Sequence, residues 1–243
     1  MASIDDLAPI AAESAFIFTG SIAQTGERTT PLPSGNATTA AVSVEHVIKA
    51  PIGLRGLAGR EVTAQLLHPL APGHYLFFAD PLSVGASIAV KERAHFDAEE
   101  REVAEAAVER DYAARMAPRL EAAFLVALGT EGEVRPLVSP AERRGRPPWA
   151  MARFEIERVL KGRKLRRVTL VGPIHASKHL PRAPALRAGR HAILILQRPP
   201  EDAMERLPEE DRQTAAFIAD TYDIQPPDRL EALERIIRGS DRE

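Results

Sequence analysis

The chain has 243 residues, of which 44% are hydrophobic and 27% charged, so it can bury apolar cores and is not expected to be disordered. It contains no cysteine, which excludes disulfide bonds, thiolate zinc sites and cysteine nucleophiles. The first residues lack the basic and apolar regions of a signal peptide, and no apolar run approaches the roughly 18 residues of a membrane span. We therefore expect a soluble, cytoplasmic protein.

The formal net charge of −2 conceals an uneven distribution along the chain. Residues 1–96 carry −2 and residues 97–120 carry −3, whereas residues 121–198 carry +10 and residues 199–243 carry −7. Blocks of opposite sign predict either that the last segment docks on the basic one or that the basic segment binds an acidic partner.

Short strands dominate the first segment. Apolar or alternating runs indicate strands at 15–22, 41–49, 60–66, 69–78 and 85–90. Gly73 stands where a tight turn starts the fourth strand. The pattern predicts a five-stranded barrel or sandwich over residues 1–96.

A helical linker is predicted over residues 97–120. Asp97 and Glu100 form a capping box at the start of an Ala/Glu/Arg-rich stretch. We expect this helix to end near Met116, because Pro118 follows.

The next segment repeats the pattern of the first about 108 positions later. Runs at 123–130, 152–161, 167–171 and 184–196 match the first four strands in order and spacing, and Gly189 matches Gly73. No fifth strand is evident, because Pro199 and Pro200 end the last run. We expect a second barrel over residues 121–198.

The acidic segment 199–243 is predicted to be helical. One helix is expected over 209–221, and Asp228 with Glu231 caps a second. Gly239 is expected to stop that second helix. The predicted plan is mainly β with added helices: two tandem barrels, each followed by a helical segment.

The order of these runs resembles the tissue-inhibitor-of-metalloproteinase/netrin-like branch of the OB-fold, as found in uncharacterised bacterial proteins. Residues 154–162 (FEIERVLKG) and 186–194 (LRAGRHAIL) carry the resemblance best. It implies a five-stranded Greek-key barrel. The family's inhibitory mechanism does not carry over, because it needs an N-terminal cysteine.

Motifs with catalytic or metal-binding chemistry are weak in this sequence. His175, Ser177 and His179 lie between prolines, so we interpret them as loop residues rather than as a nucleophile or metal site. The glycine-rich stretch 53–59 precedes a strand rather than a helix, so we interpret it as an inter-strand loop and not a phosphate site. No catalytic residue, metal or cofactor is predicted.

Basic residues around the single tryptophan give the clearest functional signal. Cations beside an exposed aromatic side chain suit single-stranded nucleic acid, through phosphate neutralisation and base stacking. The predicted binding residues are Arg143, Arg144, Arg146, Trp149, Lys161, Arg163, Lys164, Arg166 and Arg167.

Three functional hypotheses follow. The first is a non-enzymatic interaction or scaffold protein that binds a protein partner or itself through complementary charge blocks. The second is a single-stranded nucleic-acid binder that uses the second barrel. The third is an enzyme with a composite site at the barrel junction. No membrane or disulfide-linked partner is expected.

Overall fold

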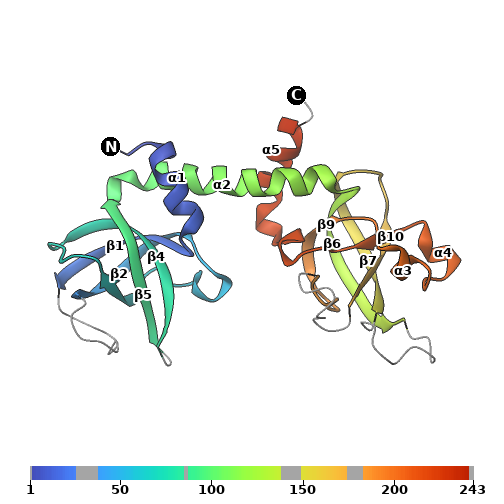
Figure 1. Cartoon of the computed structure of the whole chain (residues 1–243), viewed down its shortest axis with the longest axis horizontal. Coiled ribbons are helices and arrows are strands. Elements are labelled where there is room, and N and C mark those ends of the chain that lie inside the picture. The colour runs from blue at the N-terminus through green and yellow to red at the C-terminus, as the bar shows by residue number, and fades with distance from the viewer. Residues whose placement is uncertain (1, 26–37, 85–86, 138–148, 174–182, 241–243) are drawn as a thin grey trace. The chain divides into compact units, whose positions relative to one another are not determined.

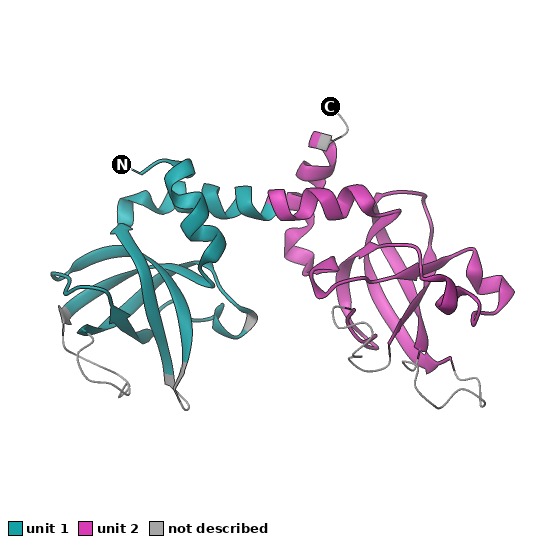
Figure 2. Ribbon diagram, viewed as in Figure 1, with its two compact units in different colours: residues 1–112 teal, residues 113–243 magenta. Residues whose placement is uncertain are grey.

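The structure is a computed structural model that describes residues 2–25, 38–84, 87–137, 149–173 and 183–240. It divides into unit 1, residues 1–112, and unit 2, residues 113–243 (Figure 2). The boundary falls inside helix α2 (Arg101–Ala122), whose first part belongs to unit 1 and whose second part belongs to unit 2. Each unit is described by itself below.

Unit 1 is a closed barrel preceded by one helix and followed by another (Figure 1). Its elements before α2 are α1 (Ile4–Glu13), β1 (Phe16–Thr25), β2 (Thr38–Lys49), η1 (Ile52–Leu54), β3 (Glu61–Leu66), β4 (Gly73–Val84), β5 (Ser87–Asp97) and η2 (Ala98–Glu100).

The barrel order β1-β2-β3-β5-β4 explains where the apolar residues of unit 1 go. All neighbouring strands pair antiparallel except β3 and β5, which are parallel. Alternate residues therefore face inward, and Phe16, Phe18, Val42 and Phe77 fill the interior. The closed five-stranded barrel fits an OB-like fold, as predicted.

The two helices of unit 1 cover the outer face of β1 and β4. Leu7 and Ala11 of α1 pack with Ile17 of β1, and Phe78 of β4 belongs to the same buried cluster. Ala104 from the first part of α2 completes the contact. Burial on both faces explains why β4 is a nearly continuous apolar run rather than an alternating one.

Unit 2 contains the second part of α2 and a six-stranded sheet. Its further elements are β6 (Leu125–Pro136), β7 (Trp149–Lys161), β8 (Arg167–Pro173), β9 (His191–Leu196), α3 (Glu201–Met204), α4 (Glu209–Arg212), β10 (Ala215–Phe217), η3 (Thr221–Asp223), β11 (Ile224–Gln225), η4 (Pro227–Arg229) and α5 (Leu230–Ser240).

The sheet of unit 2 has the order β10-β8-β7-β6-β9-β11 and is not closed, so two equal tandem barrels are not what the chain forms. Short β10 pairs parallel with β8, as β5 does with β3 in unit 1. On its other side, β10 is joined to the residue after β9 by an isolated bridge between Phe217 and Gln197. The prolines Pro199 and Pro200 prevent β9 from turning directly into a fifth strand.

The first two strands of each unit pair in the same register, with irregularities at the same places. At Gly20 an added Cβ would lie 2.7 Å from the carbonyl oxygen of Ser43, and at Gly129 it would meet that of Glu155, so both positions need glycine. The corresponding pairs are Ile17–Lys49 and Val126–Lys161, Phe18–Val47 and Ala127–Val159, and Gly20–Val44 and Gly129–Ile156.

The correspondence extends into the helix before each first strand, which the sequence reading missed in unit 1. The Ser14 N–H donates to Ile10 O at 3.0 Å, and the Ala123 N–H donates to Arg119 O at 3.1 Å. Counting back from these bonds, Pro9 of α1 and Pro118 of α2 take the same place.

Pro118 does not end α2, contrary to the prediction. The proline removes one helical hydrogen bond, but the turn after it buries Leu120, and Met116 before it is also buried. Packing of these side chains outweighs the local cost, so the helix continues to Ala122.

The predicted helix over 209–221 was also wrong. Only Glu209–Arg212 is helical, and Ala215–Phe217 forms β10 instead. Ala216 and Ile218 enter the unit 2 core, while the strand bonds to β8. The unpaired edge of β8 thus decides the conformation of a segment whose local sequence favours a helix. Gly239 lies in the last turn of α5, which ends at Ser240.

Candidate binding surface of unit 2

A short turn of residues 162–167, called here the basic turn, joins β7 to β8. Gly162 has φ +97, and an added Cβ would meet Phe124 O and lie 3.2 Å from Leu125 Cα, so this position requires glycine. The Ile156 N–H donates to Arg166 O at 2.8 Å and closes the turn. The backbone of the basic turn is therefore fixed against β6 and β7.

Four cationic side chains of the basic turn are exposed: Arg163, Lys164, Arg166 and Arg167. Leu165 between them packs on the unit 2 core. Within the residues that the structure describes, no carboxylate forms an ion pair with these four side chains. Their positive charges add up in solvent, which attracts an anionic partner.

Lys161 does not belong to this exposed set, contrary to the prediction. It is half-buried, and its Nζ donates to Leu120 O at 2.5 Å and to Glu121 O at 3.0 Å. Lys49 does the same in unit 1, donating to Ala11 O at 2.6 Å. Each lysine caps the carbonyl end of the helix that precedes the first strand of its unit, β1 or β6, where the helix dipole favours a cation.

Trp149 cannot act as a stacking platform, because its side chain is only 2% exposed. Its ring packs near Phe217, with centroids 6.1 Å apart, in a cluster with Val171 and Leu207. The predicted exposure was wrong because α3, the turn after it and β10 pack against Trp149 and against Val171 of β8. Their apolar side chains take Trp149 out of solvent.

The remaining predicted cations, Arg143, Arg144 and Arg146, lie outside the described residues. The chain that follows them enters β7 at Trp149, whereas the basic turn leaves β7 at Lys161. A strand of this length spans about 40 Å at roughly 3.3 Å per residue. The structure thus separates the start of β7 from the basic turn.

Residues 199–240 pack on the rest of unit 2 through strands and apolar side chains and leave the basic turn exposed. Their described ion pairs go elsewhere, from Glu234 to Arg158 at 2.5 Å and from Asp223 to Arg119 at 2.8 Å. Five exposed carboxylates near α3 and α4 have no ion pair among the described residues; we call these five the acidic face. They are Glu201, Asp202, Glu205, Glu209 and Glu210, in and around α3 and α4.

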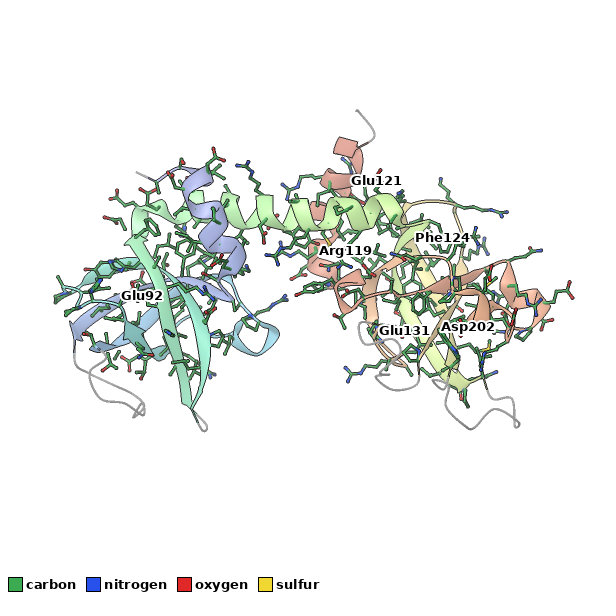
Figure 3. The ribbon with its side chains drawn as sticks, viewed as in Figure 1. Glu92, Arg119, Glu121, Phe124, Glu131 and Asp202 are labelled. Atoms are coloured by element: carbon green, nitrogen blue, oxygen red, sulfur yellow. The ribbon has the colours of Figure 1, made fainter. Side chains whose placement is uncertain are left out.

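A buried ion pair inside unit 2 was not anticipated. Glu131, labelled in Figure 3, is 1% exposed. Its Oε1 lies 2.8 Å from Arg190 Nε, and its Oε2 accepts the Arg187 N–H at 2.9 Å. Burial raises the pKa of the Glu131 carboxyl, although the Arg187 N–H and the Arg190 guanidinium oppose the rise. Burial also lowers the pKa of Arg190. In register, Ile22 of unit 1 takes the place of Glu131.

A second pair joins α2 to η3. Arg119 Nη1 donates to Asp223 Oδ1 at 2.8 Å, and Asp223 Oδ2 accepts the Asp220 N–H at 2.9 Å. Burial raises the pKa of Asp223 against the opposing effect of Arg119. The spacing of Asp220 and Asp223, a capping box, was the one sequence signal for this contact.

The other sequence candidates add no chemistry to this surface. His175, Ser177 and His179 lie outside the described residues, and residues 53–59 connect β2 to β3. Among the side chains that the structure describes, no group of three His, Asp or Glu could hold a metal ion. No helix of the described ranges is long and apolar enough to cross a membrane.

Comparison with known proteins leaves the family of this chain open. No protein-family model and no curated protein matches it. A solved structure of a replication protein A heterotrimer bound to ssDNA aligns at 12% identity with a TM-score of 0.20, over 81% of this chain. The chain spans 46% of the length of that protein. So low a TM-score supports no inference about fold or function.

Proposed function

We propose that this protein is a non-enzymatic binding protein whose second unit associates with another copy of the chain through complementary charges. The basic turn of one copy would contact the acidic face of the next. If both patches pair reciprocally, two copies form a two-fold dimer, and if each copy uses its patches with different neighbours, rings or open filaments result.

The observation that carries the proposal is the unpaired state of the basic turn. Arg163, Lys164, Arg166 and Arg167 are exposed without described ion pairs, and the acidic face of the same unit is exposed in the same way. Exposed ion pairs contribute about 1 kcal/mol or less each, so several are needed at once. Association through them is expected to be weak and sensitive to salt.

Burial of the predicted stacking residue favours a protein partner over nucleic acid. Single-strand binders combine phosphate contacts with aromatic platforms. Trp149 is buried, and the outer face of β8 is covered at Val171 by the segment that contains Leu207 and Phe217. The strand face that OB-folds use for oligonucleotides is therefore closed at β8. We also propose that residues 154–162 and 186–194 reflect common ancestry with netrin-like domains. This relationship carries no function over to the present chain.

Sedimentation velocity of the full chain at about 20 and about 300 mM NaCl tests the proposal, because salt screens exposed charges much more strongly at the higher concentration. We expect concentration-dependent association at low salt that is lost at high salt. The double variant Arg163→Glu with Arg166→Glu should stay monomeric, as should Glu209→Arg with Glu210→Arg. Mixing the two variants should restore association, because each then supplies the patch that the other lacks.

The matched control is Arg135→Glu with Arg153→Glu, which makes the same charge change on exposed strand positions of unit 2. This control should associate like the unmodified chain. A monomer that is indifferent to salt, or a mixture that fails to associate, contradicts the proposal.

Nucleic acid is the second candidate, and the basic turn is the observation that favours it. Fluorescence anisotropy with labelled single strands at the same two salt concentrations separates the cases. Binding to single strands that is lost in Arg163→Glu with Arg166→Glu, without self-association of the unmodified chain, would replace the first proposal with this one.

A further inference from the structure

A pocket of about 460 Å³ lies in unit 2 beside α2. Cavities of this size hold small molecules rather than single ions. Its walls come from one face of α2, from the residue after β9 and from η3: Arg115, Met116, Pro118, Arg119, Ala122, Gln197 and Tyr222. None of these residues belongs to the basic turn or the acidic face, so the pocket is separate from the surface described above.

The charged groups that line the pocket are both cationic, Arg115 and Arg119. They lie four residues apart on α2 and so occupy the same face of the helix. Asp220 and Asp223, which pair with Arg119, are not among the lining residues. No carboxylate is among the lining residues, and a ligand there meets Arg119 already paired with Asp220 and Asp223.

The rest of the wall is mainly apolar or aromatic. Pro118 and Ala122 present exposed aliphatic surface, the buried Met116 lies behind them, and Tyr222 is 59% exposed. Its exposed ring offers a face on which a ligand ring can stack. Gln197 adds one amide that can donate or accept a hydrogen bond.

Arg119 is fixed before any ligand arrives. Its Nη1 donates to Asp223 at 2.8 Å, its Nη2 lies 3.5 Å from Asp220, and its guanidinium stands 5.5 Å from the centre of the Tyr222 ring. Figure 3 shows Arg119 reaching from α2 toward the C-terminal segment. Gln225 Nε2 donates to Tyr222 O at 2.6 Å and holds η3 in place. A pre-organised guanidinium loses little entropy on binding an anion.

Burial alone would lower the pKa of Arg119, but the hydrogen bond and charge of Asp223, with those of Asp220, hold it above its ordinary value. The cation is therefore permanent in the range where proteins function.

Unit 1 lacks the corresponding features. Its helix α1 keeps the proline, at Pro9, but Ile10 stands in the place of Arg119. The helix was thus kept in both units, whereas the cationic pair occurs in unit 2. In unit 2 Arg119 also has a structural role, because it pairs with the buried Asp223 of η3.

We propose that this pocket binds a small carboxylate with an aromatic body. The carboxylate lies between the guanidinium groups of Arg115 and Arg119, and the ring packs on Tyr222 and Pro118. Two charge-assisted hydrogen bonds to the carboxylate and stacking of the ring then act together. A ligand with only the carboxylate or only the ring binds more weakly.

Isothermal titration calorimetry of the full chain with 2-naphthoate tests this assignment. We expect saturable one-to-one binding, and at least tenfold weaker binding of both acetate, which lacks the ring, and 2-naphthalenemethanol, which lacks the charge. Arg115→Gln and Tyr222→Ala should each weaken the binding of naphthoate about tenfold, the effect of one lost charge-assisted or stacking contact.

The matched control is Arg153→Gln, an exposed arginine on β7 away from the pocket, which should bind naphthoate unchanged. Thermal unfolding of each variant verifies that unit 2 is folded. Arg119 is not used, because its removal would leave Asp223 buried without a partner. Absence of saturable binding, equal binding of the alcohol, or binding unchanged in Arg115→Gln and Tyr222→Ala would overturn the proposal.

Discussion

Unit 1 and unit 2 start alike and finish differently. Both have a proline-containing helix, a bulged first strand at Gly20 or Gly129, and a lysine at the end of the second strand that caps the helix. Unit 1 then closes its barrel with β5, which follows β4 directly. Unit 2 takes the three residues of β10 from a later segment.

The difference shows which part of the unit tolerates change. Pairing of the first strands is held by side chains that point into the core, and a slip by one residue would turn them outward. The fifth strand contributes fewer inward side chains, so a shorter strand with added helices can replace it. In unit 2 this replacement also buries Trp149 and brings the acidic face and η3 to the surface.

The first prediction concerns the position where Ile22 corresponds to Glu131. Placing the residue of unit 1 into unit 2 by Glu131→Ile should destabilise unit 2 by about 3 kcal/mol, because Arg190 and the Arg187 N–H lose their acceptor. Urea unfolding followed by the emission of Trp149, the single tryptophan, reports on unit 2. Adding Arg190→Met should recover most of the loss; if it does not, the pair is not the cause.

The second prediction concerns the glycine that starts the basic turn. Gly162→Ala should cost about 3 kcal/mol, since φ is positive and the new Cβ meets the backbone at Phe124. The control is Gly189→Ala, where φ is also positive but no atom lies within 4 Å. That change should cost about 1 kcal/mol. Equal losses in the two variants would show that crowding at Gly162 is unimportant.

The third prediction compares the two lysine caps. Lys49→Met and Lys161→Met should each destabilise their own unit by about 2 kcal/mol, because helix carbonyls lose charge-assisted hydrogen bonds. Hydrogen exchange of amides in β1 and β6 measures each unit separately. If only one of the two variants lost stability, the two lysines would not have equivalent capping roles.

The fourth prediction is a pH dependence specific to unit 2. The folded-state pKa of Glu131 is raised, so the folded state holds this proton more tightly than the unfolded state does. The contribution of Glu131 to stability therefore falls as the pH rises from its unfolded value, about 4.3, through the raised folded value. Urea unfolding between pH 4 and 7 should show this slope in the unmodified chain. Glu131→Gln should lack it, and an unchanged slope would assign it to another group.

The smallest effect is expected at the basic turn. Arg163→Glu with Arg166→Glu should change the stability of unit 2 by about 0.5 kcal/mol or less, because both side chains are exposed without described partners. The Trp149 emission assay measures this change. A large loss of stability would mean that these arginines support the fold, and their effect on association could not then be attributed to binding.

The sequence was most informative where the signal is local and periodic. Alternation located β2, β3 and β7 within a few residues, and the apolar runs located β1, β4, β6 and β9. It also identified a basic turn whose four cations are exposed in the structure. It failed at Trp149, because burial of that ring depends on residues more than 50 positions away, such as Leu207 and Phe217.

The sequence by itself determined the strand core of each unit and the block of positive charge, because both follow from neighbouring residues. Only the tertiary structure decided how unit 2 is completed and which charges stay free. Residues 215–217 became a strand since the edge of β8 offered hydrogen bonds that local preference could not outweigh. The same docking buried Trp149 and left the basic turn in solvent. A pocket with paired arginines arose where α2 meets η3, which are about 100 residues apart in sequence.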